Sequence, residues 1–112
     1  MSWQPEAQSF IEQVAETFKT HISKLNYTHQ GIAQQCKAIA GDNKERYNAC
    51  MSTLNSRTSG ILKDYNAKAN ELPVNIASCF KESGGNPEKM YKCKQDAKVE
   101  IRKILEDSVR KF

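Results

Sequence analysis

The four cysteines of this 112-residue chain occur as two copies of one motif. The first copy, CKAIAGDNKERYNAC, begins at Cys36, and the second, CFKESGGNPEKMYKC, begins at Cys79. Both fit the pattern C-x4-G-x-N-x-E-[RK]-x3-C, so a glycine and an asparagine stand at matching places. Asn43 and Asn86 each lie seven residues from the cysteine on either side. If the chain reverses at the asparagine, the cysteines of each copy come level across an antiparallel hairpin.

A disulfide across such a hairpin needs Cα atoms about 5.5 Å apart, which level positions on adjacent helices provide. Four cysteines allow three pairings. We predict Cys36–Cys50 and Cys79–Cys93, and the nested arrangement, Cys36–Cys93 with Cys50–Cys79, is the second alternative. Closing a 15-residue loop stabilises a fold by about 3 kcal/mol in the chain-entropy model.

Three other uses of the cysteines fit the sequence less well than disulfides. Zinc-binding cysteines usually come in pairs only two to four residues apart, whereas thirteen residues separate these. A redox or nucleophilic cysteine is disfavoured because the chain has no C-x-x-C and no histidine near a cysteine in sequence. Four reduced, buried cysteines would leave the duplicated spacing unexplained.

The first third of the chain predicts one long helix. Apolar side chains recur every three or four residues from Ile11 to Ile39, which is the period of an amphipathic helix. Pro5 suits a first helical turn, and Gly41 is a natural stop. A helix over residues 6–40 would be roughly 50 Å long at 1.5 Å per residue.

The rest of the chain also shows helical periodicity. Asn43 is a good N-cap for a second apolar stripe, and Pro73 is expected to end or kink that helix. Asn86 followed by Pro87 predicts another helix start. The predicted helices are 6–40, 44–71, 74–83 and 87–111. We therefore predict an all-α fold and one domain over residues 1–112, with two disulfide-clamped antiparallel hairpins, about 6–71 and 74–111, and a long first helix.

Composition limits the partners that such a fold could have. Hydrophobic residues make up 38% of the chain and charged residues 27%, which predicts a thin core that needs staples or a partner. The net charge is +4, but no run of five like charges occurs, so solvated helix faces are favoured and no nucleic-acid partner is expected. No apolar stretch of about 18 residues could span a membrane. The start, MSWQPEAQSFIEQVAETF, lacks the features of a signal peptide or an Arg-rich presequence.

No catalytic group emerges from the sequence, so we expect a protein that is not an enzyme and has no metal or cofactor. His21 and His29 both lie on the first predicted helix, where packing explains a histidine better than catalysis. Gly84-Gly85 is a helix stop and not a phosphate-binding loop. Trp3, Phe10 and Phe18 are the candidate partner-binding residues, as apolar side chains on or before the long first helix.

The paired cysteines, helical pattern, small size and absence of a visible leader resemble the twin cysteine-x(n)-cysteine proteins of the mitochondrial intermembrane space. These are related to the coiled-coil-helix–coiled-coil-helix proteins, and the resemblance covers residues 36–93. Members commonly have a shorter spacing within one continuous helix, whereas a Gly-x-Asn break interrupts each pair here. The resemblance implies import without a cleaved presequence and trapping by a disulfide relay. The relay recognises a cysteine flanked by aromatic or aliphatic residues, as in Tyr47, Cys50 and Leu54.

The resemblance also implies a function. We expect a non-catalytic accessory subunit on the intermembrane-space side of an inner-membrane respiratory-chain complex. Its partners would be other protein subunits, with peripheral membrane contact as an addition. The alternative is a soluble assembly factor, chaperone, or lipid or precursor carrier of the same compartment; a copper carrier would want adjacent cysteines, which are absent. A secreted, disulfide-stapled binding protein is the third interpretation.

Overall fold

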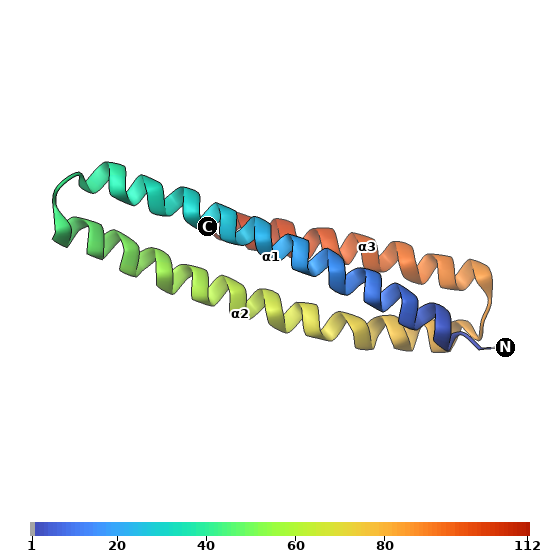
Figure 1. Ribbon diagram of the computed structural model, residues 1–112. Coiled ribbons are helices and arrows are strands. Elements are labelled where there is room, and N and C mark those ends of the chain that lie inside the picture. The colour runs from blue at the N-terminus through green and yellow to red at the C-terminus, as the bar shows by residue number, and fades with distance from the viewer. Residues whose placement is uncertain (1) are drawn as a thin grey trace.

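The computed structural model describes residues 2–112, which form three α-helices and no strand (Figure 1). Helix α1 spans Gln4–Ala40, α2 spans Lys44–Ser83 and α3 spans Pro87–Arg110. Each helix runs antiparallel to the one before it, so the molecule is a rod of 66 × 18 × 16 Å. The predicted all-α fold with disulfide-clamped hairpins and a long first helix is confirmed.

Both turns use the glycine and asparagine that the repeat places there. Gly41 ends α1 with φ 57°, and Gly84 ends α2 with φ 61°. These are backbone conformations that glycine adopts without steric cost. The side-chain oxygen of Asn43 accepts a hydrogen bond of 3.0 Å from the backbone N–H of Arg46. The duplicated G-x-N element therefore stops one helix and caps the next, twice.

Asn86 caps its helix with two hydrogen bonds, whereas Asn43 accepts one. The side-chain oxygen of Asn86 accepts hydrogen bonds from the backbone N–H groups of Glu88 and Lys89, at 3.0 and 3.2 Å. Pro87 follows at the first position of α3, where its missing N–H would have had no helical partner anyway. The start of α3 is thus set by the same residues that predicted it.

The predicted break at Pro73 is wrong, because α2 continues through it as one helix of 40 residues. The two hairpins consequently share α2, and the predicted helices 44–71 and 74–83 are a single element. Proline has no N–H to donate to the carbonyl of Ala69, which destabilises a helix interior by about 3 kcal/mol. Buried Leu72 and Ile76 flank the proline, so tertiary packing holds the helix together where local preference would interrupt it.

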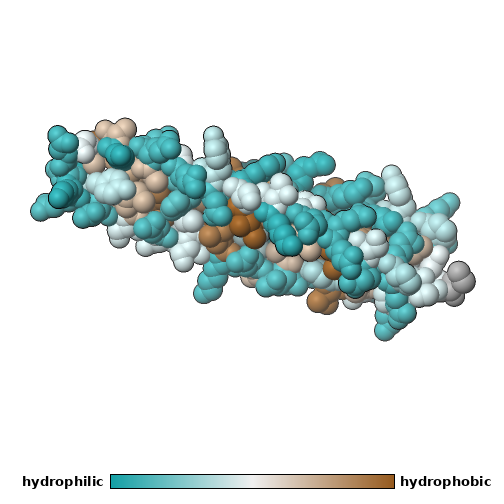
Figure 2. Space-filling model, viewed as in Figure 1, coloured by the Kyte–Doolittle hydropathy of each residue, from teal (hydrophilic) through white to brown (hydrophobic). Residues whose placement is uncertain are grey.

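The core lies where all three helices run together. Phe10 of α1 stacks on Phe80 of α2 with ring centroids 6.2 Å apart, and Phe18 meets Tyr65 edge-on at 5.7 Å. Helix α3 closes this core with a stripe of small and aliphatic side chains: Met90, Cys93, Ala97, Ile101 and Ile104. The surface in Figure 2 is largely hydrophilic, with brown apolar side chains showing between the helices.

Helix α3 covers only part of the α1–α2 pair. It has 24 residues against 37 in α1 and 40 in α2, and Figure 1 shows it stopping near the middle of the rod. Its last residues are fixed to the middle of α2: Lys111 Nζ lies 3.4 Å from a carboxylate oxygen of Asp64, and Arg57 donates a hydrogen bond of 2.9 Å to the carbonyl oxygen of Phe112. Beyond that level only α1 and α2 remain. We call residues 27–56 the two-helix arm.

Candidate interaction surface

Two disulfides join the helices close to the two turns. Cys36 and Cys50 connect α1 to α2 with Cα atoms 5.7 Å apart, and Cys79 and Cys93 connect α2 to α3 with Cα atoms 5.9 Å apart. The pairing within each repeat is therefore confirmed over the nested alternative. The four cysteines account for every thiol of the chain. Because the turns lie at opposite ends of the rod, each end carries one cross-link.

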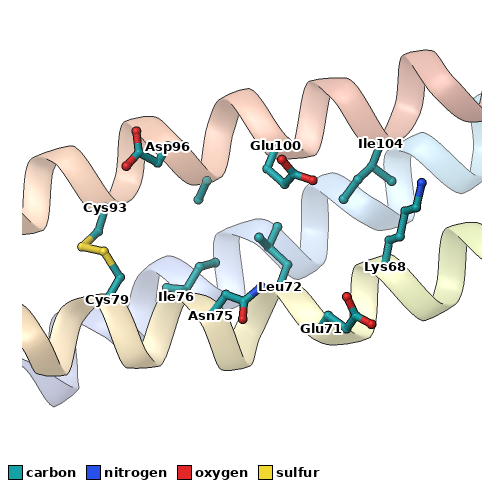
Figure 3. Close-up of a pocket in the computed structure, with 11 residues that line it drawn as sticks. Lys68, Glu71, Leu72, Asn75, Ile76, Cys79, Cys93, Asp96, Glu100 and Ile104 are labelled. Atoms are coloured by element: carbon teal, nitrogen blue, oxygen red, sulfur yellow. A yellow bond between two sulfur atoms is a disulfide. The ribbon is translucent and has the colours of Figure 1, made fainter.

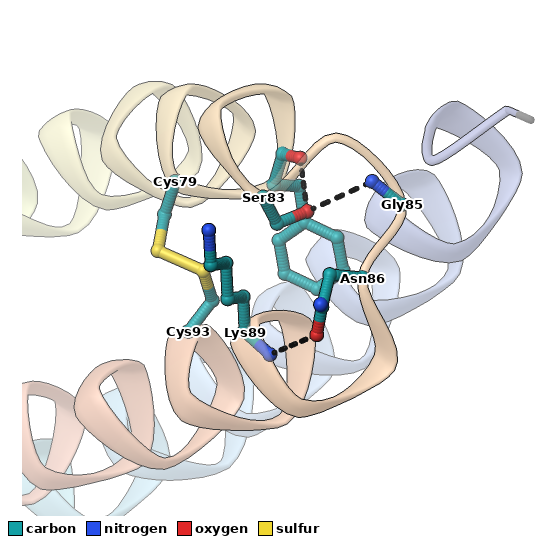
Figure 4. The surroundings of a disulfide bond; sticks show 7 residues. Cys79, Ser83, Gly85, Asn86, Lys89 and Cys93 are labelled. Atoms are coloured by element: carbon teal, nitrogen blue, oxygen red, sulfur yellow. Dashed lines mark hydrogen bonds between the residues drawn. A yellow bond between two sulfur atoms is a disulfide. The ribbon is translucent and has the colours of Figure 1, made fainter.

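The Cys79–Cys93 cross-link is accompanied by hydrogen bonds in the turn next to it (Figure 4). The hydroxyl of Ser83 donates to the carbonyl oxygen of Phe80 and accepts a hydrogen bond of 3.3 Å from the backbone N–H of Gly85. Ser83 and Phe80 are both buried. This turn is thus held by covalent, polar and apolar contacts at once.

The candidate partner-binding residues Phe10 and Phe18 do not form a free surface. They are 5% and 7% exposed and belong to the core against Phe80 and Tyr65. The helical period predicted Phe18, but not Phe10, on the apolar face of α1, and in the structure both side chains are covered by the packing of the other helices. Trp3, the third candidate, is half-buried against the core just before α1. None of the three is available as a whole to a partner in this fold.

The two-helix arm differs from the rest of the rod in charge. Its α1 wall, YTHQGIAQQCKAIA over residues 27–40, contains Lys37 as its one charged residue, and its α2 wall, YNACMSTLNS over residues 47–56, contains none. The whole chain is 27% charged. Figure 2 shows this end of the rod with pale and tan surface next to a hydrophilic tip. Depletion of charge is a feature of the centre of protein–protein interfaces and is unlike a helix face kept only for solubility.

The arm buries little of its own apolar surface. Its buried side chains are Cys36, Ala40 and Leu54, and all three lie outside the main core cluster. Where the arm meets the rest of the rod, His29 and Thr58 form a hydrogen bond of 2.7 Å between the ring Nδ1 and the hydroxyl. With so small a core, the Cys36–Cys50 disulfide carries a large share of the arm's stability.

Large apolar side chains lie exposed on the arm. Ile39 is 69% exposed and Tyr27 is 78% exposed. Ile39 was predicted to lie on the buried stripe, but the neighbouring Ala40 takes that place, because the helix period of 3.6 drifts past a strict three-and-four spacing. Ile32 and Cys50 are half-buried. The arm therefore presents an uncharged, partly apolar face that no third helix covers.

The sequence analysis did not predict the uncovered face of the two-helix arm, although the sequence contains a signal for it. Residues 27–40 and 47–56 carry almost no charge although both are helical, and the last predicted helix is too short to reach the first turn. The two facts point to an interaction surface only when α2 is known to be continuous, because its full length is what leaves the arm uncovered.

Helix α3 is flanked by a groove on each side. The groove between α2 and α3 has a volume of about 380 Å³ and is bordered by Glu71, Asp96 and Glu100. Figure 3 shows Leu72 and Ile104 projecting between these two helices, with the Cys79–Cys93 disulfide at one end. The second groove, between α1 and α3, has a volume of about 370 Å³.

The described part of the chain contains neither a group of metal ligands nor a membrane-spanning helix. Within residues 2–112, no three histidine, cysteine, aspartate or glutamate side chains are grouped as a metal site requires. None of the helices there carries the long apolar stretch of a membrane span. Comparisons of the chain with protein-family models, with curated proteins and with solved structures found no match.

Proposed function

We propose that this protein is a non-catalytic structural subunit that docks onto helices of partner subunits through its two-helix arm. The compartment that we propose is the mitochondrial intermembrane space, and the partner is an inner-membrane respiratory-chain complex. The observation that carries the docking proposal is the uncovered, charge-poor face of the arm, which includes Ile32 and Ile39.

The form of the partner is inferred from the fold itself. Helices α1 and α2 run on together beyond the end of α3, so the side of this pair on which α3 packs has no third helix in the arm. A helix of another subunit would extend the three-helix packing along that side. Such a helix would bury Ile39 and the exposed part of the half-buried Cys50. Because the arm walls contain one charge, Lys37, the docked helix needs a largely uncharged, small-residue face.

Two further observations support the proposed compartment. Both cysteine pairs are oxidised, which is typical of proteins in oxidising compartments. The two repeated cysteine pairs in a small all-helical chain resemble the twin cysteine-x(n)-cysteine proteins, which acquire their disulfides in the intermembrane space, although the spacing is longer here and a turn interrupts each pair. A disulfide also keeps the arm's two helices together before the partner binds, so less order has to be acquired during docking.

Docking can be tested with the tagged full-length chain expressed in cells from which the native copy is removed. Mitochondria would be fractionated, and mild-detergent extracts would be separated on native gels. We expect the chain in the intermembrane-space fraction and comigrating with a respiratory complex. A chain found only free would reject the subunit role and favour a soluble assembly factor, chaperone or carrier. A chain outside mitochondria would reject the compartment.

The docking surface is tested separately with a matched pair of variants. Ile39→Lys places a charge on the arm, and Val99→Lys places the same charge on α3, where Val99 is 62% exposed. We expect Ile39→Lys to lose the complex-bound fraction and Val99→Lys to keep it. Equal behaviour of the two variants would show that the arm is not the contact, whatever complex the protein joins.

A further inference from the structure

The two grooves beside α3 carry opposite charge. The groove between α2 and α3 is bordered by three acids, Glu71, Asp96 and Glu100, with Lys68 as its one base. The groove between α1 and α3 is lined by three bases and no acid: Lys24 from α1, and Lys98 and Arg102 from α3. Helix α3 thus separates an acidic face from a basic one, although the chain as a whole is only slightly basic.

The bases of the α1–α3 groove have no ion-pair partner. Among the residues that the structure describes, the ion pairs are Lys19–Glu16, Lys94–Glu6 and Lys111–Asp64. Lys98 and Arg102 are one helical turn apart, so their side chains come from the same face of α3. Two unpaired cations next to one another favour an anion at this rim.

The floor of the same groove is apolar. Phe10 and Val14 line it from α1, and Ile101 and Leu105 line it from α3. These apolar side chains lie four residues apart on each helix, and Gln13, Thr17, His21 and Lys24 make the rest of the α1 lining polar. A short apolar stretch beside cationic side chains matches a short acyl chain with an anionic head.

His21 adds an unsatisfied polar atom to this groove. It is one of the lining residues, and its ring Nδ1 is buried without a hydrogen-bond partner in residues 2–112. Buried polar atoms of folded proteins nearly always have a partner. Burial, with a smaller effect from Lys24, lowers the pKa of His21, so a neutral imidazole with one N–H to donate is present at neutral pH.

We propose that the groove between α1 and α3 binds a single-chain anionic amphiphile of the fatty-acid type. Its acyl chain lies along Phe10, Val14, Ile101 and Leu105, and its carboxylate is held by Lys98 and Arg102. The site lies in the three-helix part of the rod and uses no residue of the two-helix arm, so it does not depend on the proposed docking function.

The experiment uses the oxidised full-length chain and dodecanoate below its micelle-forming concentration. Amide chemical shifts would be followed by NMR during titration, and affinity would be measured by calorimetry. We expect saturable one-to-one binding, with the shifts confined to residues 10–24 and 98–105. Dodecyl maltoside should bind more weakly, and dodecyltrimethylammonium should bind weakest because its head repels the rim.

Two double variants with the same net charge provide the control. Lys98→Glu with Arg102→Glu reverses the rim and should weaken dodecanoate binding about tenfold or more, since two charge contacts become repulsive. Lys92→Glu with Lys103→Glu makes the same change at exposed positions and should leave the affinity within about twofold. Thermal melts of both variants verify that each is folded.

Several outcomes would overturn the proposal. One is the absence of saturable dodecanoate binding, and another is an equal loss of affinity in both double variants. Equal binding of the cationic and anionic amphiphiles would remove the role of the rim. Displacement of dodecanoate by an acidic peptide at similar concentration would identify the groove as a protein-docking site instead.

Discussion

The hydroxyl of Tyr65 on α2 donates a hydrogen bond of 3.2 Å to the backbone carbonyl oxygen of Phe18 on α1. The two rings also meet edge-on at 5.7 Å. Tyr65 is 1% exposed, and burial raises its pKa to about 12. It lies one residue beyond Asp64, which holds Lys111, so this contact joins α1 to α2 at the level where α3 ends.

Two substitutions of Tyr65 should separate its hydrogen bond from its packing. Tyr65→Phe removes only the hydroxyl and should lower the free energy of unfolding by about 0.5–1.5 kcal/mol. Tyr65→Ala also leaves a large cavity and should cost about 3–5 kcal/mol. Urea unfolding followed by circular dichroism measures both. If the phenylalanine variant lost as much stability as the alanine variant, the hydroxyl and not the ring would be the main contribution.

The two disulfides should stabilise different parts of the rod. Replacing Cys36 and Cys50 by serine should loosen the two-helix arm, because few other buried side chains hold it together. Closure of a loop of this size contributes about 3 kcal/mol in the chain-entropy model. Hydrogen exchange measured by mass spectrometry should therefore become faster in residues 27–56 and stay nearly unchanged in α3.

The matched control is the serine pair at Cys79 and Cys93. Those cysteines lie beside the main core, so their loss should speed exchange in α3 and leave the arm protected. Uniformly faster exchange in both variants would mean that the rod unfolds as one cooperative unit and that the arm is not a separate local element.

His21 should make stability depend on pH. Burial, and then the charge of Lys24, lower the pKa of His21 in the folded state below its ordinary value of 6.5. As pH falls through 6.5, the unfolded chain takes up this proton first, so protonation favours unfolding. Stability from the neutral ring is present above pH 6.5 and is lost as pH falls through the folded-state pKa. His21→Gln should flatten this part of the stability profile.

The same pKa can be observed directly by NMR titration of the His21 ring protons. Lys24→Gln removes the second cause and should move the pKa of His21 upward, but not fully to 6.5, because burial is the larger cause. An unchanged pKa in the Lys24 variant would show that the lysine charge is screened by solvent at this distance.

The predictions that succeeded rested on local signals. Asn43 and Asn86 cap helices in the structure as their positions in the repeat indicated, and the level spacing of the cysteines predicted both disulfides. Capping and loop closure depend on residues close in sequence, so local patterns in a single amino-acid sequence are enough to predict the helix caps and the disulfides.

What the sequence did not predict depends on packing between distant segments. The helical period placed Phe18 on the apolar face of the first helix, but only the positions of α2 and α3 show that this face is covered. The helical period alone cannot choose between neighbouring positions. The structure buries Ala40 and leaves Ile39 exposed. The uncovered arm depends likewise on the relative lengths of α2 and α3, which the expected break at Pro73 concealed.

Replacing Pro73 should measure how strongly packing overrides local preference in α2. Pro73→Ala restores an N–H that can donate to the carbonyl of Ala69 and should stabilise the protein by about 1–3 kcal/mol, the upper value being the full helix-interior cost of proline. The gain is reduced because the half-buried ring lines the α1–α2 contact. Gly60→Ala is the control: nothing lies within 4 Å of an added Cβ there, so it should add about 0.5–1 kcal/mol. If urea unfolding gave Pro73→Ala no larger gain than Gly60→Ala, the helix around Pro73 would already have relieved the cost of its missing hydrogen bond.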